Sequence, residues 1–184
     1  MTDFEEKAKE AEDSDDFRIL AQTILESDSG DKDLAKSMFK KAIDLAEDSG
    51  DYRKCAEDIS EDLYLGDKEW ASELYKIAID KAEDSDELIE IAESIHDYLD
   101  DKSWEIEVYK MAAHKAIETA ESFYDYVACA ESICEDIDDK EWARDVYKMA
   151  VDNAEDSVHY TRCADSIEEC LGDEDWAQEV RKKK

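Results

Sequence analysis

The sequence predicts an all-α protein, an α-α superhelix (solenoid) of antiparallel helix pairs with a repeat of 34 to 38 residues. Three observations predict this class. Proline is absent and glycine occurs only 4 times in 184 residues, so little except turn chemistry interrupts a helix. Hydrophobic residues make up 42% of the chain and recur at helical spacing, which argues against a disordered acidic chain. The third observation is an internal repeat along the sequence.

One helix of each repeat begins beside a tryptophan. The tryptophans, with Leu34 at the corresponding place of an earlier copy, follow one another at spacings of 36, 34, 38 and 34 residues. They are Trp70, Trp104, Trp142 and Trp176. An aromatic residue stands five positions after this marker and alanines stand eight and twelve positions after it, which forms one stripe along a helix. The stripe residues are Phe39, Tyr75, Tyr109 and Tyr147, then Ala42, Ala78, Ala112 and Ala150, then Ala46, Ala82, Ala116 and Ala154.

A second block alternates with the first. It has an aromatic residue or leucine, an alanine four positions later and an isoleucine three positions after that, which is one face of an amphipathic helix. Its copies are Phe17/Ala21/Ile24, Tyr52/Ala56/Ile59, Leu88/Ala92/Ile95, Tyr126/Ala130/Ile133 and Tyr160/Ala164/Ile167. The two blocks predict about eleven short helices in a single array over residues 1–184, with about four full helix-pair repeats and partial repeats at the ends.

The connections between the blocks contain cap and turn signals. Serines beside Glu-Asp runs are predicted to cap the second block, and they are Ser14, Ser49, Ser85 and Ser157. Glycines are expected to end helices in the left-handed conformation, each followed by a capping aspartate, and these pairs are Gly30-Asp31, Gly66-Asp67 and Gly172-Asp173. Asp100 and Asp138 replace the glycine in two copies. Because aspartate adopts the left-handed conformation less readily than glycine, these two turns should be slightly less stable. The extra residues after Ala116 predict one more helical turn.

One half of the repeat resembles the second helix of a tetratricopeptide repeat. The run Gly66-Asp67-Lys68-Glu69-Trp70-Ala71, with Tyr75 and Ala78 after it, has that family's turn, small residue, aromatic residue and alanine at the expected spacing. Ala143, Tyr147 and Ala150 repeat it. The first helix lacks the family's usual Trp and Leu-Gly pair, and an acidic residue replaces its proline. The resemblance implies a helical-repeat scaffold whose first helices line a concave surface.

Pairs of carboxylates recur on the first helix of the later repeats. One stands directly after the alanine of the stripe and the other four residues further on, an arrangement that costs an isolated helix roughly 0.2–0.5 kcal/mol. The pairs are Glu57/Glu61, Glu93/Asp97, Glu131/Glu135 and Asp165/Glu169, and Gln22/Glu26 occupies the place in the first copy. If the helices line the concave surface, these residues form an acidic ladder, the name used below for these eight acids.

The acidic ladder has two interpretations. It can bind a Lys/Arg-rich segment of a protein or peptide through charge-assisted hydrogen bonds and electrostatic steering. Alternatively, it is a solvated face whose repetition comes from a duplicated ancestor, with repeated lysines neutralising it from neighbouring helices. Those lysines include Lys68, Lys102 and Lys140.

The charge balance excludes several classes of partner. The chain has 23 Lys and Arg against 55 Asp and Glu, a net charge of -32. Nucleic acids and anionic membrane surfaces both need a basic face, so neither is expected as a partner. The sequence has no apolar run long enough to cross a membrane and no signal-peptide pattern at its start, so a cytoplasmic location is expected.

No enzyme motif, metal site or cofactor site is expected. Gly-rich phosphate loops and the common catalytic signatures are missing. His159 and Cys163 stand one helical turn apart, but zinc usually needs three or four protein ligands. The acidic turn at residues 28–33 does not have the register of a calcium loop.

The five cysteines are expected to be reduced thiols, because none forms a C-x-x-C pair and no secretion signal is present. Three of them, Cys55, Cys129 and Cys163, alternate with Leu20 and Ile91 at one position of the repeat. That interchange predicts small hydrophobic residues in the core.

The sequence therefore predicts a non-enzymatic scaffold that binds a basic protein or peptide segment in an acidic groove. The alternative is a charge-driven polyanion or nucleic-acid mimic that sequesters many basic proteins, and adaptation to a saline cytoplasm is a further alternative. Because the chain opens inside a repeat, weak self-association through an uncovered face is also a prediction.

Overall fold

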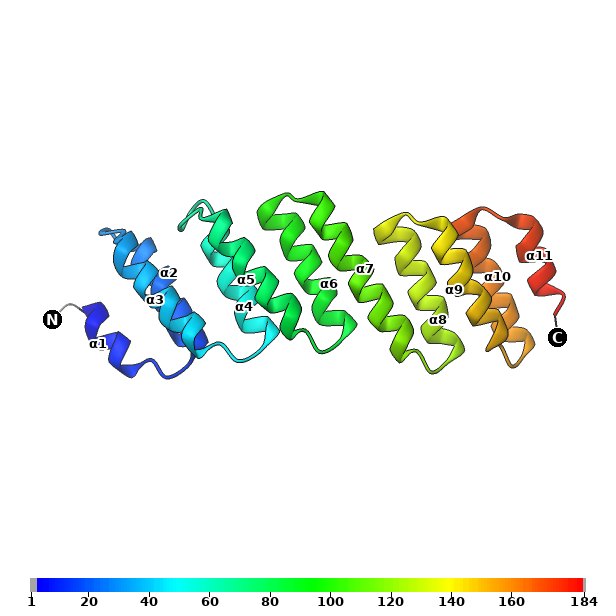
Figure 1. Ribbon diagram of the computed structural model, residues 1–184, viewed down its shortest axis with the longest axis horizontal. Helices are drawn as coiled ribbons and strands as arrows, with labels where there is room; N and C mark the ends of the chain where they lie inside the picture. Colours follow the sequence, from blue (N-terminus) through cyan, green and yellow to red (C-terminus); the bar gives the residue numbers. More distant parts are fainter. Residues whose placement is uncertain (1–2, 184) are drawn as a thin grey trace. The chain divides into compact units, whose positions relative to one another are not determined.

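The computed structural model describes residues 3–183 and confirms the all-α fold class. Eleven α-helices and two short π-helical turns account for the regular structure, and residues 3–183 contain no β-strand. The chain divides into two compact units. The first unit comprises the residues up to Glu83 together with Glu87–Glu105, and the second comprises Asp84–Asp86 together with the residues from Ile106 onward. Within each unit, helices adjacent in sequence pack as antiparallel pairs (Figure 1).

The first unit contains two complete helix pairs. Its helices are α1 (Asp3–Glu10), α2 (Ser14–Glu26), α3 (Lys32–Leu45), α4 (Ser49–Ser60) and α5 (Lys68–Lys81). The pairs are α2 with α3 and α4 with α5, and α2 also contacts α4. The next helix, α6 (Ser85–Ser94), continues into the π-helical turn η1 (Ile95–Leu99), which packs against α4 and α5. Successive first helices therefore lie beside one another, as the repeat predicts.

The second unit has the same construction. Its elements are most of α7 (Lys102–Thr119), then α8 (Phe123–Ser132), η2 (Ile133–Ile137), α9 (Lys140–Asp152), α10 (Ser157–Leu171) and α11 (Glu174–Arg181). The pairs are α8 with α9 and α10 with α11, and α10 also contacts α8, η2 and α9. Helix α7 has 18 residues whereas α3 and α5 have 14, so the extra turn is confirmed.

The alanine and isoleucine stripe of the first helices forms the core. All five alanines and all five isoleucines of that stripe are fully buried. The aromatic residue of the second helices is also fully buried at Phe39, Tyr75 and Tyr147, whereas Tyr109 is half-buried. The alanines twelve positions after the marker are half-buried, and Ala46 and Ala82 cap the ends of α3 and α5 instead of extending the stripe.

The tryptophans connect successive second helices. All four are half-buried, and Trp104, Trp142 and Trp176 each contact a side chain of the preceding second helix. Trp104 lies edge-on to Tyr75 at 6.3 Å in the first unit, and Trp176 lies under the guanidinium of Arg144 at 5.0 Å in the second. Such cation–π contacts stabilise by roughly 0.5–1 kcal/mol at partly exposed sites.

The predicted serine caps are wrong by one residue. Helices α2, α4, α6 and α10 begin at Ser14, Ser49, Ser85 and Ser157. For α2, α4 and α10 the preceding residue, Asp13, Asp48 or Asp156, accepts a hydrogen bond from a backbone N–H of the first turn. A charged acceptor there also interacts favourably with the positive end of the helix, which favours aspartate over serine.

Left-handed residues stand in the turn after each first helix, but among the glycines the prediction that they end the helix is confirmed only for Gly172. Helices α2 and α4 end earlier, at the extended residues Ser27 and Glu61, so Gly30 and Gly66 lie in the following turns. Gly30, Gly66 and Gly172 have φ values of 50°, 64° and 69°, and Asp100 and Asp138 both have a φ of 57°. The two aspartates directly follow η1 and η2. The capping role of Asp31, Asp67 and Asp173 is confirmed as well.

Candidate functional site

The eight acids of the ladder occupy different kinds of position. Glu57, Glu93, Glu131 and Asp165, which follow the buried alanines, lie within α4, α6, α8 and α10. In the other row, Glu61 is the C-cap of α4, Asp97 lies in η1, Glu135 lies in η2 and Glu169 lies in α10. Glu57 and Glu61 are half-buried in the first unit, whereas Glu93 and Asp97 are exposed.

The residue after the buried alanine contacts the next repeat. Glu57 of α4 accepts a hydrogen bond of 2.7 Å from the Ser94 hydroxyl in the first unit. In the second unit Glu131 of α8 accepts one from the Ser166 hydroxyl of α10, and the Arg162 guanidinium lies 2.8 Å from the same carboxylate. Both contacts join neighbouring first helices in the same register. These two acids therefore hold successive repeats together and have little free hydrogen-bonding capacity.

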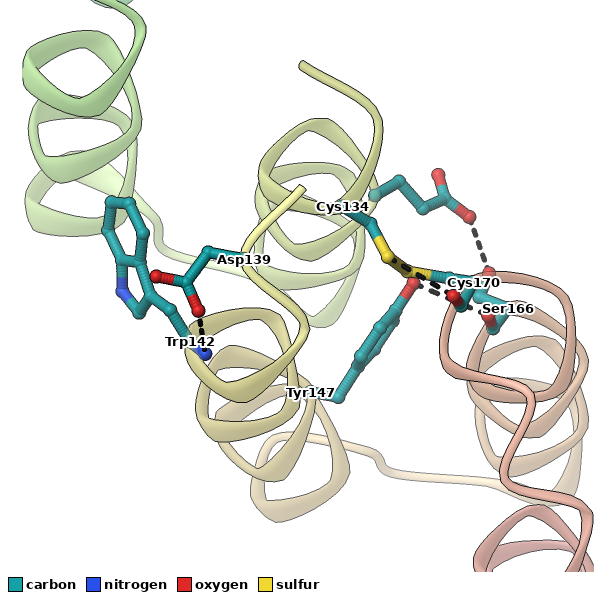
Figure 2. Close-up of a disulfide and its surroundings, with 7 residues drawn as sticks. Cys134, Asp139, Trp142, Tyr147, Ser166 and Cys170 are labelled. Carbon is teal, nitrogen blue, oxygen red and sulfur yellow. Dashed lines mark hydrogen bonds between the residues drawn. A yellow bond between two sulfur atoms is a disulfide. The ribbon is translucent and has the colours of Figure 1, made fainter. Parts of the chain in front are cut away.

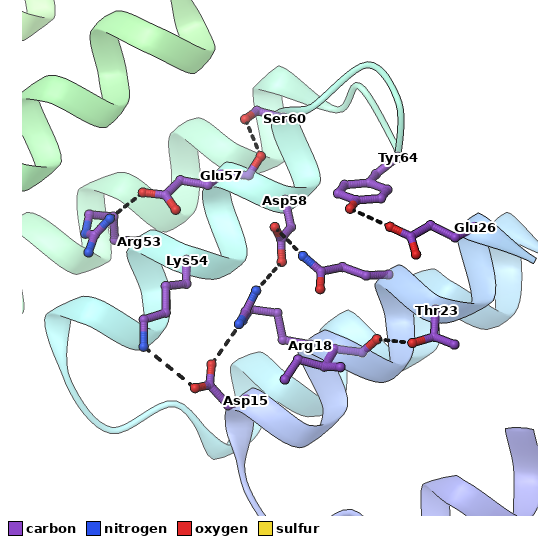
Figure 3. Close-up of polar contacts among 12 residues, drawn as sticks. Asp15, Arg18, Thr23, Glu26, Arg53, Lys54, Glu57, Asp58, Ser60 and Tyr64 are labelled. Atoms are coloured by element: carbon purple, nitrogen blue, oxygen red, sulfur yellow. Dashed lines mark hydrogen bonds and ion pairs between the residues drawn. The ribbon is translucent and has the colours of Figure 1, made fainter.

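Between α2 and α4, a buried group of polar side chains joins the two first helices, and we call it the polar junction (Figure 3). Asp58 is only 8% exposed and accepts hydrogen bonds of 2.8 Å from both Arg18 and Gln22. Arg18 also donates to Asp15, which lowers the pKa of the Asp15 carboxyl. Burial raises the pKa of Asp58 even though Arg18 and Gln22 donate to it. This junction was not predicted from the sequence, because Asp58 lies outside the acidic ladder.

The outer acids of the second unit behave differently. Glu135 and Glu169 are exposed, and neither has an ion pair or hydrogen bond within residues 3–183. Together with Glu131 they line a pocket of about 490 Å³ that is bordered by α8, η2 and α10. We call it the acidic pocket, and its other lining residues are Cys134, Asp138, Lys140, Arg162, Ser166 and Cys170. Four carboxylates against two cations leave the lining negative.

The fourth ladder residue of the second unit does not line the acidic pocket. Asp165 lies 2.6 Å from the guanidinium of Arg181, which also pairs with Glu168 at 2.7 Å. Three of the four predicted acids of this unit thus line the acidic pocket, whereas Asp165 lies with Arg181 in an adjacent hollow that Glu169 also borders. Arg162, which partly neutralises the pocket through Glu131, was not predicted from the sequence.

A disulfide joins the two walls of the acidic pocket, and it corrects the prediction of five reduced thiols. Cys134 of η2 is bonded to Cys170 of α10, with 6.2 Å between their Cα atoms and 36 residues between them in sequence (Figure 2). A local C-x-x-C search cannot find this pair, because it forms between equivalent faces of neighbouring repeats. The signal in the sequence is the separation itself, which lies within the range of the repeat length.

The other three cysteines are free and buried, which confirms their predicted place in the core. Burial raises the pKa of both the Cys55 and the Cys163 thiol to about 12, and it also raises that of Cys129. These thiols stay protonated near neutral pH and are poor nucleophiles.

No group of three or more His, Cys, Asp or Glu side chains between residues 3 and 183 is arranged to hold a metal ion. None of the described helices is both long enough and apolar enough to span a bilayer. Comparison with protein-family models, curated proteins and solved structures finds no match for the chain. The function must therefore be inferred from the geometry of the acidic pocket.

Proposed function

We propose that the protein is a non-enzymatic, tetratricopeptide-like scaffold that binds a Lys/Arg-rich protein or peptide segment, with the acidic pocket as its contact site. The observation that supports this proposal is that two carboxylates without an ion pair or hydrogen bond in residues 3–183, Glu135 of η2 and Glu169 of α10, line one pocket. They come from two successive repeats. An extended basic segment crossing from one repeat to the next would meet both.

The acids of the pocket differ in whether they already have a partner within the protein, and this difference decides which of them contact the basic segment. Glu131 already accepts from Ser166 and pairs with Arg162, so an incoming cation would have to displace those groups. Glu135 and Glu169 require no such displacement and gain a charge-assisted hydrogen bond directly. One exposed ion pair stabilises by only about 0.2–1 kcal/mol. Useful affinity therefore needs several cations of the partner to bind at once.

The alternative is a charge-driven polyanion that sequesters basic proteins without a defined site. The observation that favours it is the net charge of -32, which attracts cations to the whole surface at low salt. In that case any two carboxylates would contribute equally to binding, and affinity would disappear as salt screens the field.

A pair of variants with the same net charge separates the two proposals. The pocket variant is Glu135→Gln/Glu169→Gln, and the control variant is Glu118→Gln/Glu179→Gln, which removes two exposed carboxylates outside the pocket lining. The probe is a fluorescein-labelled peptide of alternating lysine and arginine, and the measurement is fluorescence anisotropy at about 150 mM salt.

A site-specific scaffold predicts that the pocket variant binds the probe about tenfold more weakly, a loss of about 1.4 kcal/mol, while the control variant loses less than about twofold. An equal loss in both variants would support the polyanion instead. If the wild-type protein failed to bind the probe at this salt concentration, the scaffold proposal would be wrong.

A further inference from the structure

The Cys134–Cys170 disulfide lies in the wall of the acidic pocket. Both cysteines are half-buried and both line the cavity of about 490 Å³. A molecule of the size of a small thiol fits in that volume. The pocket therefore offers a route to the bridge in the folded unit.

The surroundings of the bridge set the charge of the molecule that reaches it. Glu135 follows Cys134 directly in the sequence and Glu169 directly precedes Cys170. All four residues line the acidic pocket, and both carboxylates are exposed. Of the cations in the lining, Arg162 is paired with Glu131. An approaching cation is attracted to this negative lining, and an approaching anion is repelled.

The remaining cysteines do not compete for the reaction. Cys55, Cys129 and Cys163 are buried, and burial raises the pKa of each thiol. Because the thiolate is the attacking species in disulfide exchange, these three side chains do not reshuffle the bridge in the folded protein.

We propose that the Cys134–Cys170 bridge is a thiol–disulfide exchange site that is reached through the acidic pocket and that selects small cationic thiols. The proposal concerns the reactivity of the bridge and does not require that a basic segment binds in the pocket.

The exchange takes place in two steps and consumes two molecules of the small thiol. The thiolate of the first molecule attacks one sulfur of the bridge, so the Cys134–Cys170 bond breaks, a mixed disulfide forms and the other cysteine leaves as a thiolate. A second small thiolate attacks the mixed disulfide and releases the small-molecule disulfide. The protein gains two electrons, its two thiolates take protons from water, and the two small thiols are oxidised to one disulfide.

The test compares a cationic thiol, cysteamine, with an anionic one, 2-mercaptoethanesulfonate, on the oxidised full-length protein. Released cysteines are trapped with N-ethylmaleimide at successive times, then counted and located by mass spectrometry. The quantity compared is the ratio of the two rate constants in Glu135→Gln/Glu169→Gln and in Glu118→Gln/Glu179→Gln. The intrinsic reactivity of each thiol cancels between the two variants, and their net charges are equal.

We expect the ratio of cysteamine to mercaptoethanesulfonate rate constants to be roughly tenfold lower in the pocket variant at low salt, and the difference to shrink at high salt. Labels should appear on Cys134 and Cys170 alone. Equal ratios in the two variants would overturn the proposal, as would labelling of the core cysteines. A bridge that reacts only after unfolding in urea would overturn it too. The readout needs no peptide, so failure here and failure of the proposed scaffold function are distinguishable.

Discussion

Opening the Cys134–Cys170 bridge should destabilise the second unit by about 4 kcal/mol. The bridge joins residues separated by 36 positions, so it restricts a long segment of the unfolded chain. Closing a loop of this length removes roughly 13 cal/mol/K of chain entropy from the unfolded state, which corresponds to about 4 kcal/mol at 25 °C. Loss of the bridge returns that entropy to the unfolded state and leaves the folded helices in place.

The measurement is urea unfolding of the Cys134→Ser/Cys170→Ser variant beside the wild-type protein. Replacing Trp70 and Trp104 with phenylalanine in both proteins leaves the fluorescence of Trp142 and Trp176, which belong to α9 and α11 of the second unit. Circular dichroism reports the loss of helix in the whole chain. The difference between the two unfolding curves then gives the contribution of the bridge to the second unit.

Two outcomes would refute this reasoning. A difference in unfolding free energy below about 1 kcal/mol would mean that the unfolded chain is already restricted, because the loop term alone predicts about four times more. A phosphine reductant should destabilise the wild-type protein and leave the serine variant unchanged. Equal effects on both proteins would show that the reductant acts elsewhere.

Four further predictions concern single side chains. Tyr75→Phe should raise the unfolding free energy by about 1 kcal/mol, because the buried hydroxyl has no partner with hydrogen-bond geometry among residues 3–183. Tyr147→Phe should lower the unfolding free energy by about 0.5 kcal/mol, because that hydroxyl donates to the backbone carbonyl of Ser166. Urea unfolding measures both changes, and changes of the same sign in the two variants would contradict this prediction. Asp58→Ala should cost about 2 kcal/mol, because Gln22 loses its acceptor and Arg18 keeps only the more exposed Asp15. A loss below about 0.5 kcal/mol would argue against the junction. Hydrogen bonds from the Glu121 backbone and from Ser122 lower the pKa of Asp125. The stability that Asp125 contributes is therefore present above pH 3.8 and is lost as the pH falls through the lowered pKa. The loss of thermal stability caused by Asp125→Asn, measured by thermal unfolding, should shrink across that pH range.

The helices and the core follow closely from the sequence. The apolar residues of one helix face recur within one or two turns, so residues close together in the sequence are enough to predict which face is buried. The alanines and isoleucines of the first helices are fully buried at every copy. Serine caps were predicted one residue too late, because neighbouring aspartate and serine are both good caps and the local pattern does not separate them.

The candidate site follows from the sequence only in part. The repeat places carboxylates at matching positions, and three of them, Glu131, Glu135 and Glu169, do line one pocket. Their roles differ, since Glu131 joins two repeats whereas the other two are unpaired. Asp165 was predicted with them, but the Arg181 side chain near the end of α11 reaches it. Which acid meets which cation depends on side-chain reach across a helix interface, and the repeat period does not contain that information.

The sequence by itself determined the helical repeat, the starts of α2, α4, α6 and α10 to within one residue and the apolar core, because each of these depends on residues close together in the chain. Only the tertiary structure decided the Cys134–Cys170 bridge and the Arg18–Asp58 junction. Both join residues about one repeat apart. Such residues come within bonding distance only after neighbouring first helices have stacked in one register, which the packing of their buried faces sets.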